Sequence, residues 1–138
     1  MTIKTTKKFP RKTREVENFW IPLSDGVKLA ARMWIPVDAE KKPVPAVLEY
    51  LPYRKRDGTI VRDALTHPYL AGHGYAAIRV DMRGNGDSEG IMLDEYTQQE
   101  QDDAIAAHVH ADGRVTMASK IGMGECITHM GAITLAVR

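Results

Sequence analysis

The only cysteine of this 138-residue chain is the first candidate for covalent chemistry. Cys126 stands in the run Gly124-Glu125-Cys126-Ile127-Thr128. A cysteine attacks carbonyl carbon well once a neighbouring base converts its thiol to the thiolate. His129 is three residues away, so on a helix it would lie one turn along the same element rather than across a site from the sulfur. Cys126 is therefore a candidate nucleophile for which the neighbouring residues offer no well-placed base.

A zinc site is the alternative use of the same region. The patterns His108-x-His110 and Cys126-x-x-His129 supply nitrogen and sulfur ligands at spacings that zinc tolerates. Two histidines two residues apart share a face only on a strand, whereas this stretch has the pattern of a helix. Solvent-facing histidines and a half-buried cysteine are the simpler interpretation, so we predict no metal site and no cofactor.

A glycine-rich loop forms the second chemical feature. Residues 82–90 follow an apolar segment, and Asp81 and Arg83 could hold the loop in place through hydrogen bonds. The spacing G-x-G-x-x-x-G is one residue too long for a dinucleotide-binding fingerprint, and the loop does not open directly into a helix. We therefore predict a structural role for it.

Residues 15–35 should form a β-hairpin that leads into a sheet. The segment 15–21 is rich in β-forming residues without clean alternation, which favours an edge strand. Ser24-Asp25-Gly26 is typical of a turn, and the following strand, 27–35, places alternate apolar residues on one face.

Alternating strands and helices follow the hairpin. The apolar run 46–51 predicts a buried strand, and the segments 63–71 and 75–81 predict a helix and a second buried strand. Thr97 should cap a helix over 98–108, and a further strand is expected from Val115. The order indicates an α/β fold, with an N-terminal β-hairpin followed by parallel strands with crossover helices. Ligands bind at the carboxyl ends of such strands, which points to Tyr53 and the 83–90 loop.

Four sequence blocks, in this order and rough spacing, resemble the CocE/NonD hydrolases, which are α/β-hydrolases similar to X-Pro dipeptidyl-peptidases of family S15. The blocks are Ser24-Asp25-Gly26-Val27-Lys28-Leu29-Ala30, Leu51-Pro52-Tyr53-Arg54-Lys55-Arg56, Ala71-Gly72-His73-Gly74-Tyr75-Ala76 and Val80-Asp81-Met82-Arg83-Gly84-Asn85-Gly86-Asp87-Ser88-Glu89-Gly90. The resemblance is good over residues 15–103 and ragged afterwards. It implies a partial α/β-hydrolase fold.

The resemblance also implies roles for three residues. Tyr53 would donate its hydroxyl to the oxyanion, Cys126 would stand where the family has its nucleophilic serine, and the backbone N–H of Ile127 would be the second oxyanion donor. The family's acid and base come from segments well beyond the nucleophile, and no residue here matches them. The segment 105–112 is also short for the family's helix. We therefore expect residues 15–138 to be an incomplete, truncated or frame-disrupted N-terminal part of the domain.

Composition narrows the class of protein. A hydrophobic content of 43% with 27% charged residues is typical of a globular domain, and no apolar run is long enough for a membrane span or a secretory signal, so we expect a cytoplasmic protein. Residues 1–14 carry six basic side chains and no acidic one, so the net charge of +1 leaves −5 for the rest. We predict a disordered tail there rather than a nucleic-acid-binding arm, because no aromatic stacking pattern accompanies the charges.

Two functions from different classes remain. The first is a serine-type acyl hydrolase acting on ester, amide or X-Pro peptide bonds through an acyl-enzyme, with a small acyl or peptide substrate. The second is a catalytically silent remnant or interaction module that keeps part of the sheet and self-associates through an unpaired edge. Neither reading includes a nucleic-acid or membrane partner.

Overall fold

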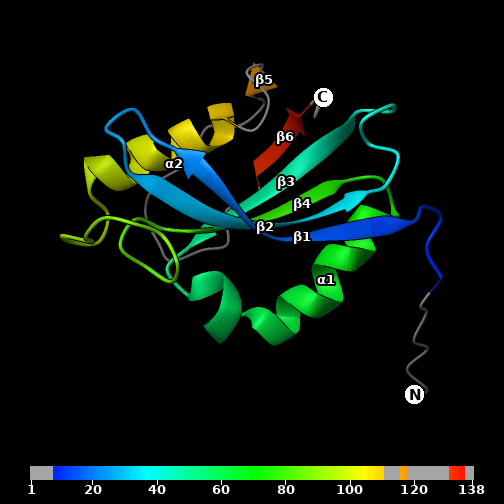
Figure 1. Ribbon diagram of the computed structural model, residues 1–138, viewed down its shortest axis with the longest axis horizontal. Helices are drawn as coiled ribbons and strands as arrows, with labels where there is room; N and C mark the ends of the chain where they lie inside the picture. Colours follow the sequence, from blue (N-terminus) through cyan, green and yellow to red (C-terminus); the bar gives the residue numbers. More distant parts are fainter. Residues whose placement is uncertain (1–7, 111–115, 118–130, 136–138) are drawn as a thin grey trace.

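The computed structural model describes residues 8–110, 116–117 and 131–135. Its centre is a mixed sheet in the order β1-β2-β4-β3-β6-β5, with helices on both faces (Figure 1). The strands are β1 (Thr13–Pro22), β2 (Lys28–Pro36), β3 (Val44–Leu51), β4 (Ala76–Asp81), β5 (Thr116–Met117) and β6 (Gly131–Leu135). The helices are α1 (Ile60–Gly72) and α2 (Gln98–His110), and a π-helical turn, η1 (Arg54–Gly58), precedes α1. The partial α/β fold expected from the sequence is confirmed.

The β-hairpin lies at one edge of the sheet, as predicted. β1 pairs with β2 in antiparallel register, and the register shifts by one residue between Val16 and Phe19. This β-bulge explains why the sequence of β1 does not alternate cleanly, since the extra residue moves the later side chains to the opposite face. On β2, Leu29 and Ile35 belong to the hydrophobic core, and Met33 packs against it.

The unit β3–α1–β4 supplies the predicted parallel pair with a crossover helix. β3 and β4 pair in parallel register from Ala46 opposite Ala76 to Leu51 opposite Asp81. All six residues of β4 are buried, as expected for a central strand. Because the two strands are parallel, their carboxyl ends lie at the same edge of the sheet.

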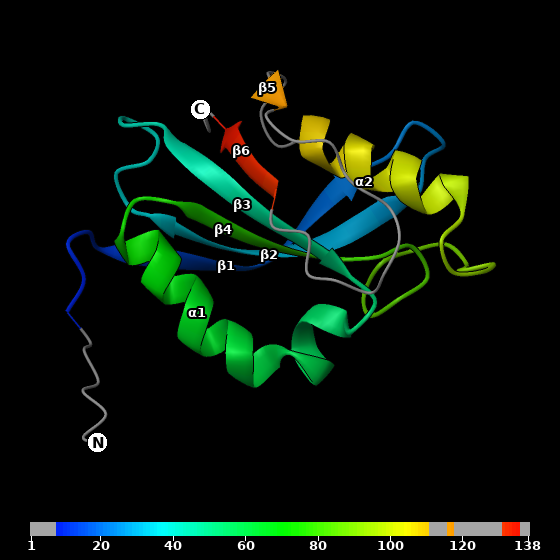
Figure 2. The same ribbon diagram turned by 180° about the vertical axis from the view of Figure 1, so that it is seen from behind.

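The two helices cover opposite faces of this sheet. Both views place α1 and η1 on one side and α2 on the other (Figures 1 and 2). The apolar core lies on the α2 side, where Leu48, Ile78 and Ala107 are buried together. Alternate residues of β3 and β4 point to the α1 side, and two of those are Glu49 and Arg79.

The last two described strands differ from the parallel arrangement expected after α2. β6 runs antiparallel to β3, and β5 runs antiparallel to β6. The strand expected from Val115 is β5, which is only two residues long within the described part. β6 was not predicted, although its residues Ile133 and Thr134 are β-branched and favour a strand.

The folded structure begins before Glu15, which moves the predicted boundary of the basic tail. The backbone N–H of Arg11 donates to Gly72 O at 3.0 Å, and its guanidinium lies 2.5 Å from Asp38 Oδ1. Phe9 packs closely against the end of α1. A Cβ added at Gly72 would lie 2.3 Å from the Cβ of Phe9. Residues 9–14 therefore belong to the fold, and residues 1–7 lie outside the described part.

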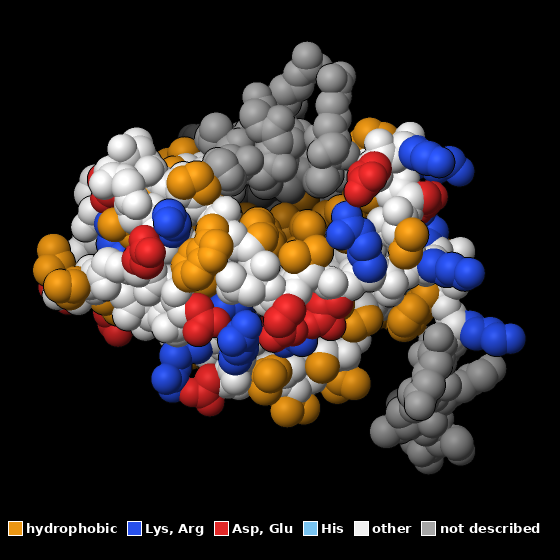
Figure 3. All heavy atoms as spheres, in the orientation of Figure 1, with side chains coloured by type: hydrophobic (Ala, Val, Ile, Leu, Met, Phe, Trp, Pro, Cys, Tyr) orange, Lys and Arg blue, Asp and Glu red, His pale blue; other side chains and the backbone are white. Residues whose placement is uncertain are grey.

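The outer face of α1 carries exposed apolar side chains. Val61, Leu65 and Tyr69 follow one another at helical spacing and are 75%, 73% and 50% exposed. Figure 3 shows hydrophobic side chains gathered along this lower side of the molecule, below a band of mixed charges. Neither described helix is long and apolar enough to cross a bilayer.

Candidate functional site

Tyr53, the predicted oxyanion donor, lies two residues after β3 at the carboxyl edge of the sheet. Pro52 ends the strand because it cannot donate to the ladder, and Tyr53 then precedes the π-helical turn η1. Its side chain is 46% exposed. The next residue, Arg54, has a φ of 57°, a left-handed conformation that a non-glycine residue rarely adopts. Strained backbone and single π-turns are both frequent at functional sites.

Local hydrogen bonds hold the reversal of the chain after Tyr53. The backbone N–H of Gly58 donates to Tyr53 O at 3.0 Å, which closes the turn over η1. Thr59 is the N-cap residue of α1, and the Asp63 N–H donates to its carbonyl oxygen at 2.9 Å. The Thr59 hydroxyl donates to Asp63 Oδ2 at 2.8 Å. These bonds fix both ends of the segment that carries Tyr53.

The glycine-rich loop after β4 lies at the same edge and has the structural role that the sequence predicted. The Ser88 hydroxyl donates to Asp81 O at 2.7 Å and accepts the N–H of Ala30 at 2.8 Å, so one side chain ties the loop to β4 and β2. The N–H of Asp87 donates to Asp81 Oδ2 at 3.0 Å. A Cβ at Gly86, whose φ is +56°, would lie 2.2 Å from that same oxygen. Only glycine permits this approach.

Arg83 anchors the loop to the rest of the molecule. Its Nε and Nη2 donate to the two carboxylate oxygens of Asp103 on α2 at 2.6 and 2.8 Å. Its guanidinium also lies 2.8 Å from Asp25 Oδ2 in the hairpin turn. The hydrogen bonds to Asp103 raise the pKa of Arg83 above its ordinary value. Arg83 therefore connects the hairpin turn, the loop after β4 and α2.

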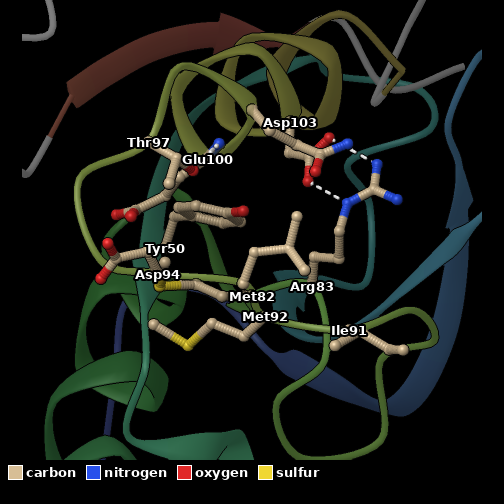
Figure 4. A pocket seen from close by; sticks show the side chains of 11 residues that line it. Tyr50, Met82, Arg83, Ile91, Met92, Asp94, Thr97, Glu100 and Asp103 are labelled. Carbon is tan, nitrogen blue, oxygen red and sulfur yellow. Dashed lines mark hydrogen bonds and ion pairs between the residues drawn. The ribbon is translucent and has the colours of Figure 1, made fainter.

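A pocket opens beside this anchor (Figure 4). It contains about 290 Å³ of space, part of it open to solvent, between the end of β3, the loop after β4 and the start of α2. Burial, with the carboxylate of Asp103 next in importance, raises the pKa of the Tyr50 phenol. The Tyr50 hydroxyl oxygen is buried and has no hydrogen-bond partner among the described residues. The lining residues are Tyr50, Met82, Arg83, Ile91, Met92, Leu93, Asp94, Thr97, Gln99, Glu100 and Asp103.

The described residues that line this pocket include no serine or cysteine. Among those lining residues Thr97 carries the only aliphatic hydroxyl, and its oxygen accepts the N–H of Glu100 at 3.3 Å as the cap of α2. The carboxylate of Glu100 in turn accepts the N–H of Tyr96 at 2.9 Å, which is close to the capping box that the sequence predicted. The pocket can hold part of a ligand.

A buried ionic cluster under α1 was not foreseen from the sequence. Glu49 on β3 and Arg79 on β4 are register neighbours, and Arg79 Nη1 donates to Glu49 Oε2 at 3.1 Å. Arg62 and Asp63 of α1 complete the cluster, with Arg62 Nη2 2.5 Å from Glu49 Oε2 and 2.9 Å from Asp63 Oδ1. The signal in the sequence was a charged residue at matching interior positions of two mainly apolar strands.

The geometry of this cluster would suit a metal ion, but the charges of the cluster argue against one. Glu49, Asp63 and His67 offer ligand atoms within 4.8 Å of one another. The two carboxylates are already paired with Arg62 and Arg79, so a divalent cation would add uncompensated positive charge to a buried site. The His67 ring packs against Trp34 with the ring centroids 4.7 Å apart and the planes tilted by 51°, and burial lowers the pKa of His67. The cluster is therefore a structural ion network.

The remaining sequence-predicted site residues lie outside the described part of the chain. These are Cys126, Ile127 and His129. The backbone of α2 includes His108 and His110, so the helix expected there is confirmed. The proximity of Tyr53 to Cys126 stays a prediction.

Comparisons with known proteins agree with the four sequence blocks. A profile of the X-Pro dipeptidyl-peptidase (S15) family matches residues 25–124. Two crystal structures of a CocE/NonD family hydrolase from Staphylococcus aureus are similar in fold, with 20% and 18% identity and TM-scores of 0.58 and 0.56. Each alignment covers 70% of this chain and 20% of the solved chain, so the present chain spans about a fifth of their length. No curated protein sequence matches. The chain belongs to the X-Pro dipeptidyl-peptidase (S15) family of hydrolases.

Proposed function

We propose that this chain supplies the N-terminal, oxyanion-binding part of a hydrolase that cleaves ester, amide or X-Pro peptide bonds through an acyl-enzyme. The family assignment supports hydrolysis, and the position of Tyr53 at the carboxyl edge of β3 is the observation that carries the proposed mechanism. In this proposal Cys126 is the nucleophile, and the backbone N–H of Ile127 is the second oxyanion donor. Acid and base partners of the nucleophile are not assigned to residues of this chain.

The chemistry follows the ordinary two-step course of acyl transfer. The Cys126 sulfur attacks the carbonyl carbon of a small acyl or peptide substrate, and the carbonyl oxygen becomes an oxyanion. The Tyr53 hydroxyl donates a hydrogen bond to this oxyanion. As the tetrahedral intermediate collapses, the bond from the carbonyl carbon to the leaving group breaks, and the alcohol or amine leaves with the proton that the thiol gave up. Water then hydrolyses the thioester acyl-enzyme to the acid and the free thiol. A fixed donor stabilises charge that exists only in the transition state.

Hydrolysis of a p-nitrophenyl acyl ester by the full chain tests this proposal. We expect a burst of p-nitrophenolate followed by turnover, both abolished by Cys126→Ala. Tyr53→Phe should lower kcat about 100-fold, since one oxyanion donor typically contributes 10²–10³ in rate. Tyr69→Phe, a change of an exposed phenol on α1, is the matched control and should leave the rate within about twofold. No burst and no turnover above buffer would reject the proposal.

The second candidate is a catalytically silent interaction module. The exposed stripe of Val61, Leu65 and Tyr69 on α1 favours it, because contiguous exposed apolar surface often marks a contact site. Self-association through a sheet edge belongs to the same proposal. Sedimentation analysis of the inactive Cys126→Ala chain tests it, since a monomer at all concentrations would exclude the self-associating form.

A further inference from the structure

Lys55 is fully buried at the carboxyl edge of the sheet, two residues after Tyr53. An ammonium group is costly to bury unless it is paired. Its Nζ lies 2.5 Å from Asp87 Oδ2 in the loop after β4 and 3.4 Å from Asp81 Oδ2 at the end of β4. The Lys55 side chain therefore extends from η1 to the loop after β4.

The backbone of Lys55 is held by the same carboxylate as its side chain. The Lys55 N–H donates to Asp81 Oδ1 at 2.5 Å, while Asp81 Oδ2 accepts the N–H of Asp87 at 3.0 Å. Asp81 thus connects the π-helical turn and the β4 loop through its two oxygens. Asp81 is itself only 1% exposed, so solvent does not compete for these bonds.

These contacts lie next to Arg54, which has a left-handed backbone conformation. Arg54 sits between Tyr53 and Lys55 with its φ at 57°. Such a conformation is unfavourable for a non-glycine residue and persists only where the surrounding structure holds it. On one side, the Gly58 N–H bonds to Tyr53 O. On the other side, the buried attachment of Lys55 to Asp81 and Asp87 prevents the turn from relaxing.

We infer that Lys55, held by Asp81 and Asp87, is the positioning residue that fixes the orientation of Tyr53 at the site. The inference rests on the proposed function for its catalytic consequence, because it assigns Tyr53 a fixed orientation toward an oxyanion. The claim that Lys55 fixes the orientation of the Tyr53 side chain does not depend on catalytic activity. Loss of the ion pair frees the turn, and the phenol then samples several orientations.

Asp87→Asn is the most informative variant, because it keeps the shape of the side chain, removes the charge facing Lys55 and lies at a position that is 43% exposed. Lys55→Met removes the buried charge from the other side. Glu89→Gln is the matched control, since Glu89 lies in the same loop as Asp87, is exposed, and accepts the N–H of Lys28, which glutamine can also accept.

The first measurement uses the full chain with 3-fluorotyrosine at position 53, observed by ¹⁹F NMR, together with amide exchange at Gly58. We expect one narrow resonance in the wild type and in Glu89→Gln. In Asp87→Asn and Lys55→Met the resonance should broaden or split, and Gly58 exchange should become at least about tenfold faster. A narrow line with exchange within twofold of wild type in a folded Asp87→Asn variant would overturn the inference, whether or not Lys55→Met folds.

The second measurement separates this inference from the proposed function. If the wild type hydrolyses the p-nitrophenyl ester, Asp87→Asn should lower kcat about tenfold and leave KM within twofold, because the substrate still binds while the oxyanion donor is misplaced. An unchanged kcat in that active enzyme would contradict the positioning role. If the wild type shows no hydrolysis, the proposed function fails, and the NMR result alone decides whether Lys55 fixes Tyr53.

Discussion

Arg79 on β4 and Glu49 on β3 face each other across the parallel register, with Arg79 Nη1 3.1 Å from Glu49 Oε2 and the arginine side chain fully buried. A buried charge in the centre of a sheet is stable only because its partners are also in place. Asp63 and Arg62 come to this pair from α1, so the cluster links the helix to both strands.

The first prediction concerns this cluster. Glu49→Gln should lower the free energy of unfolding by about 3 kcal/mol, because it leaves the buried Arg79 charge without its closest carboxylate. Urea unfolding measures the change. Glu40→Gln is the control, since Glu40 pairs with Arg14 at the surface and should contribute less than about 1 kcal/mol. Equal effects of the two substitutions would show that the buried pair has no special role.

The second prediction concerns pH. Burial lowers the pKa of His67 below its ordinary value of 6.5, so the unfolded chain binds a proton there that the folded chain does not. Stability from this group is therefore complete above the unfolded pKa and is lost as pH falls below it. The urea midpoint of the wild type should decrease between about pH 7 and pH 5, and His67→Gln should flatten this decrease. An identical pH dependence in the variant would contradict the assignment.

The third prediction separates backbone strain from steric contact in the β4 loop. Gly86→Ala places a Cβ 2.2 Å from Asp81 Oδ2 at a φ of +56°, whereas Gly26→Ala adds a Cβ with no atom within 4 Å at a φ of +88°. Both should destabilise the fold through the left-handed backbone, by about 1–2 kcal/mol. Gly86→Ala should cost at least about 1 kcal/mol more, as measured by thermal or urea unfolding. Equal costs would mean that the loop moves freely away from Asp81.

The fourth prediction concerns the anchor between the β4 loop and α2. Asp103→Asn removes the charge that accepts both hydrogen bonds from Arg83, and should cost about 1.5–3 kcal/mol. Amide exchange across α2 should become faster in this variant. Asp102→Asn changes the neighbouring residue, which bonds Gln98 at the surface, and should remain within about 0.5 kcal/mol of wild type. Unchanged exchange in Asp103→Asn would remove the anchoring role of Arg83.

Local signals in the sequence determined most of the elements and the position of Tyr53. Pro52 ends β3, Thr97 caps α2, and Ser24-Asp25-Gly26 closes the hairpin, because each effect depends on a few adjacent residues. The parallel β3–α1–β4 unit follows from short apolar strands flanking a helix. The family resemblance, carried by four ordered blocks, is likewise a property of the sequence and agrees with the profile match to residues 25–124.

Only the tertiary structure decided which charged groups meet. Lys55 reaches Asp81 and Asp87 at separations of 26 and 32 residues, and Arg79 reaches Glu49 at a separation of 30. Such pairs depend on strand register and on how a turn packs beneath a loop, which no local propensity specifies. For the same reason the sequence did not foresee that β6 pairs antiparallel with β3: strand propensity indicates a strand, whereas its direction and neighbour are set by the folded sheet.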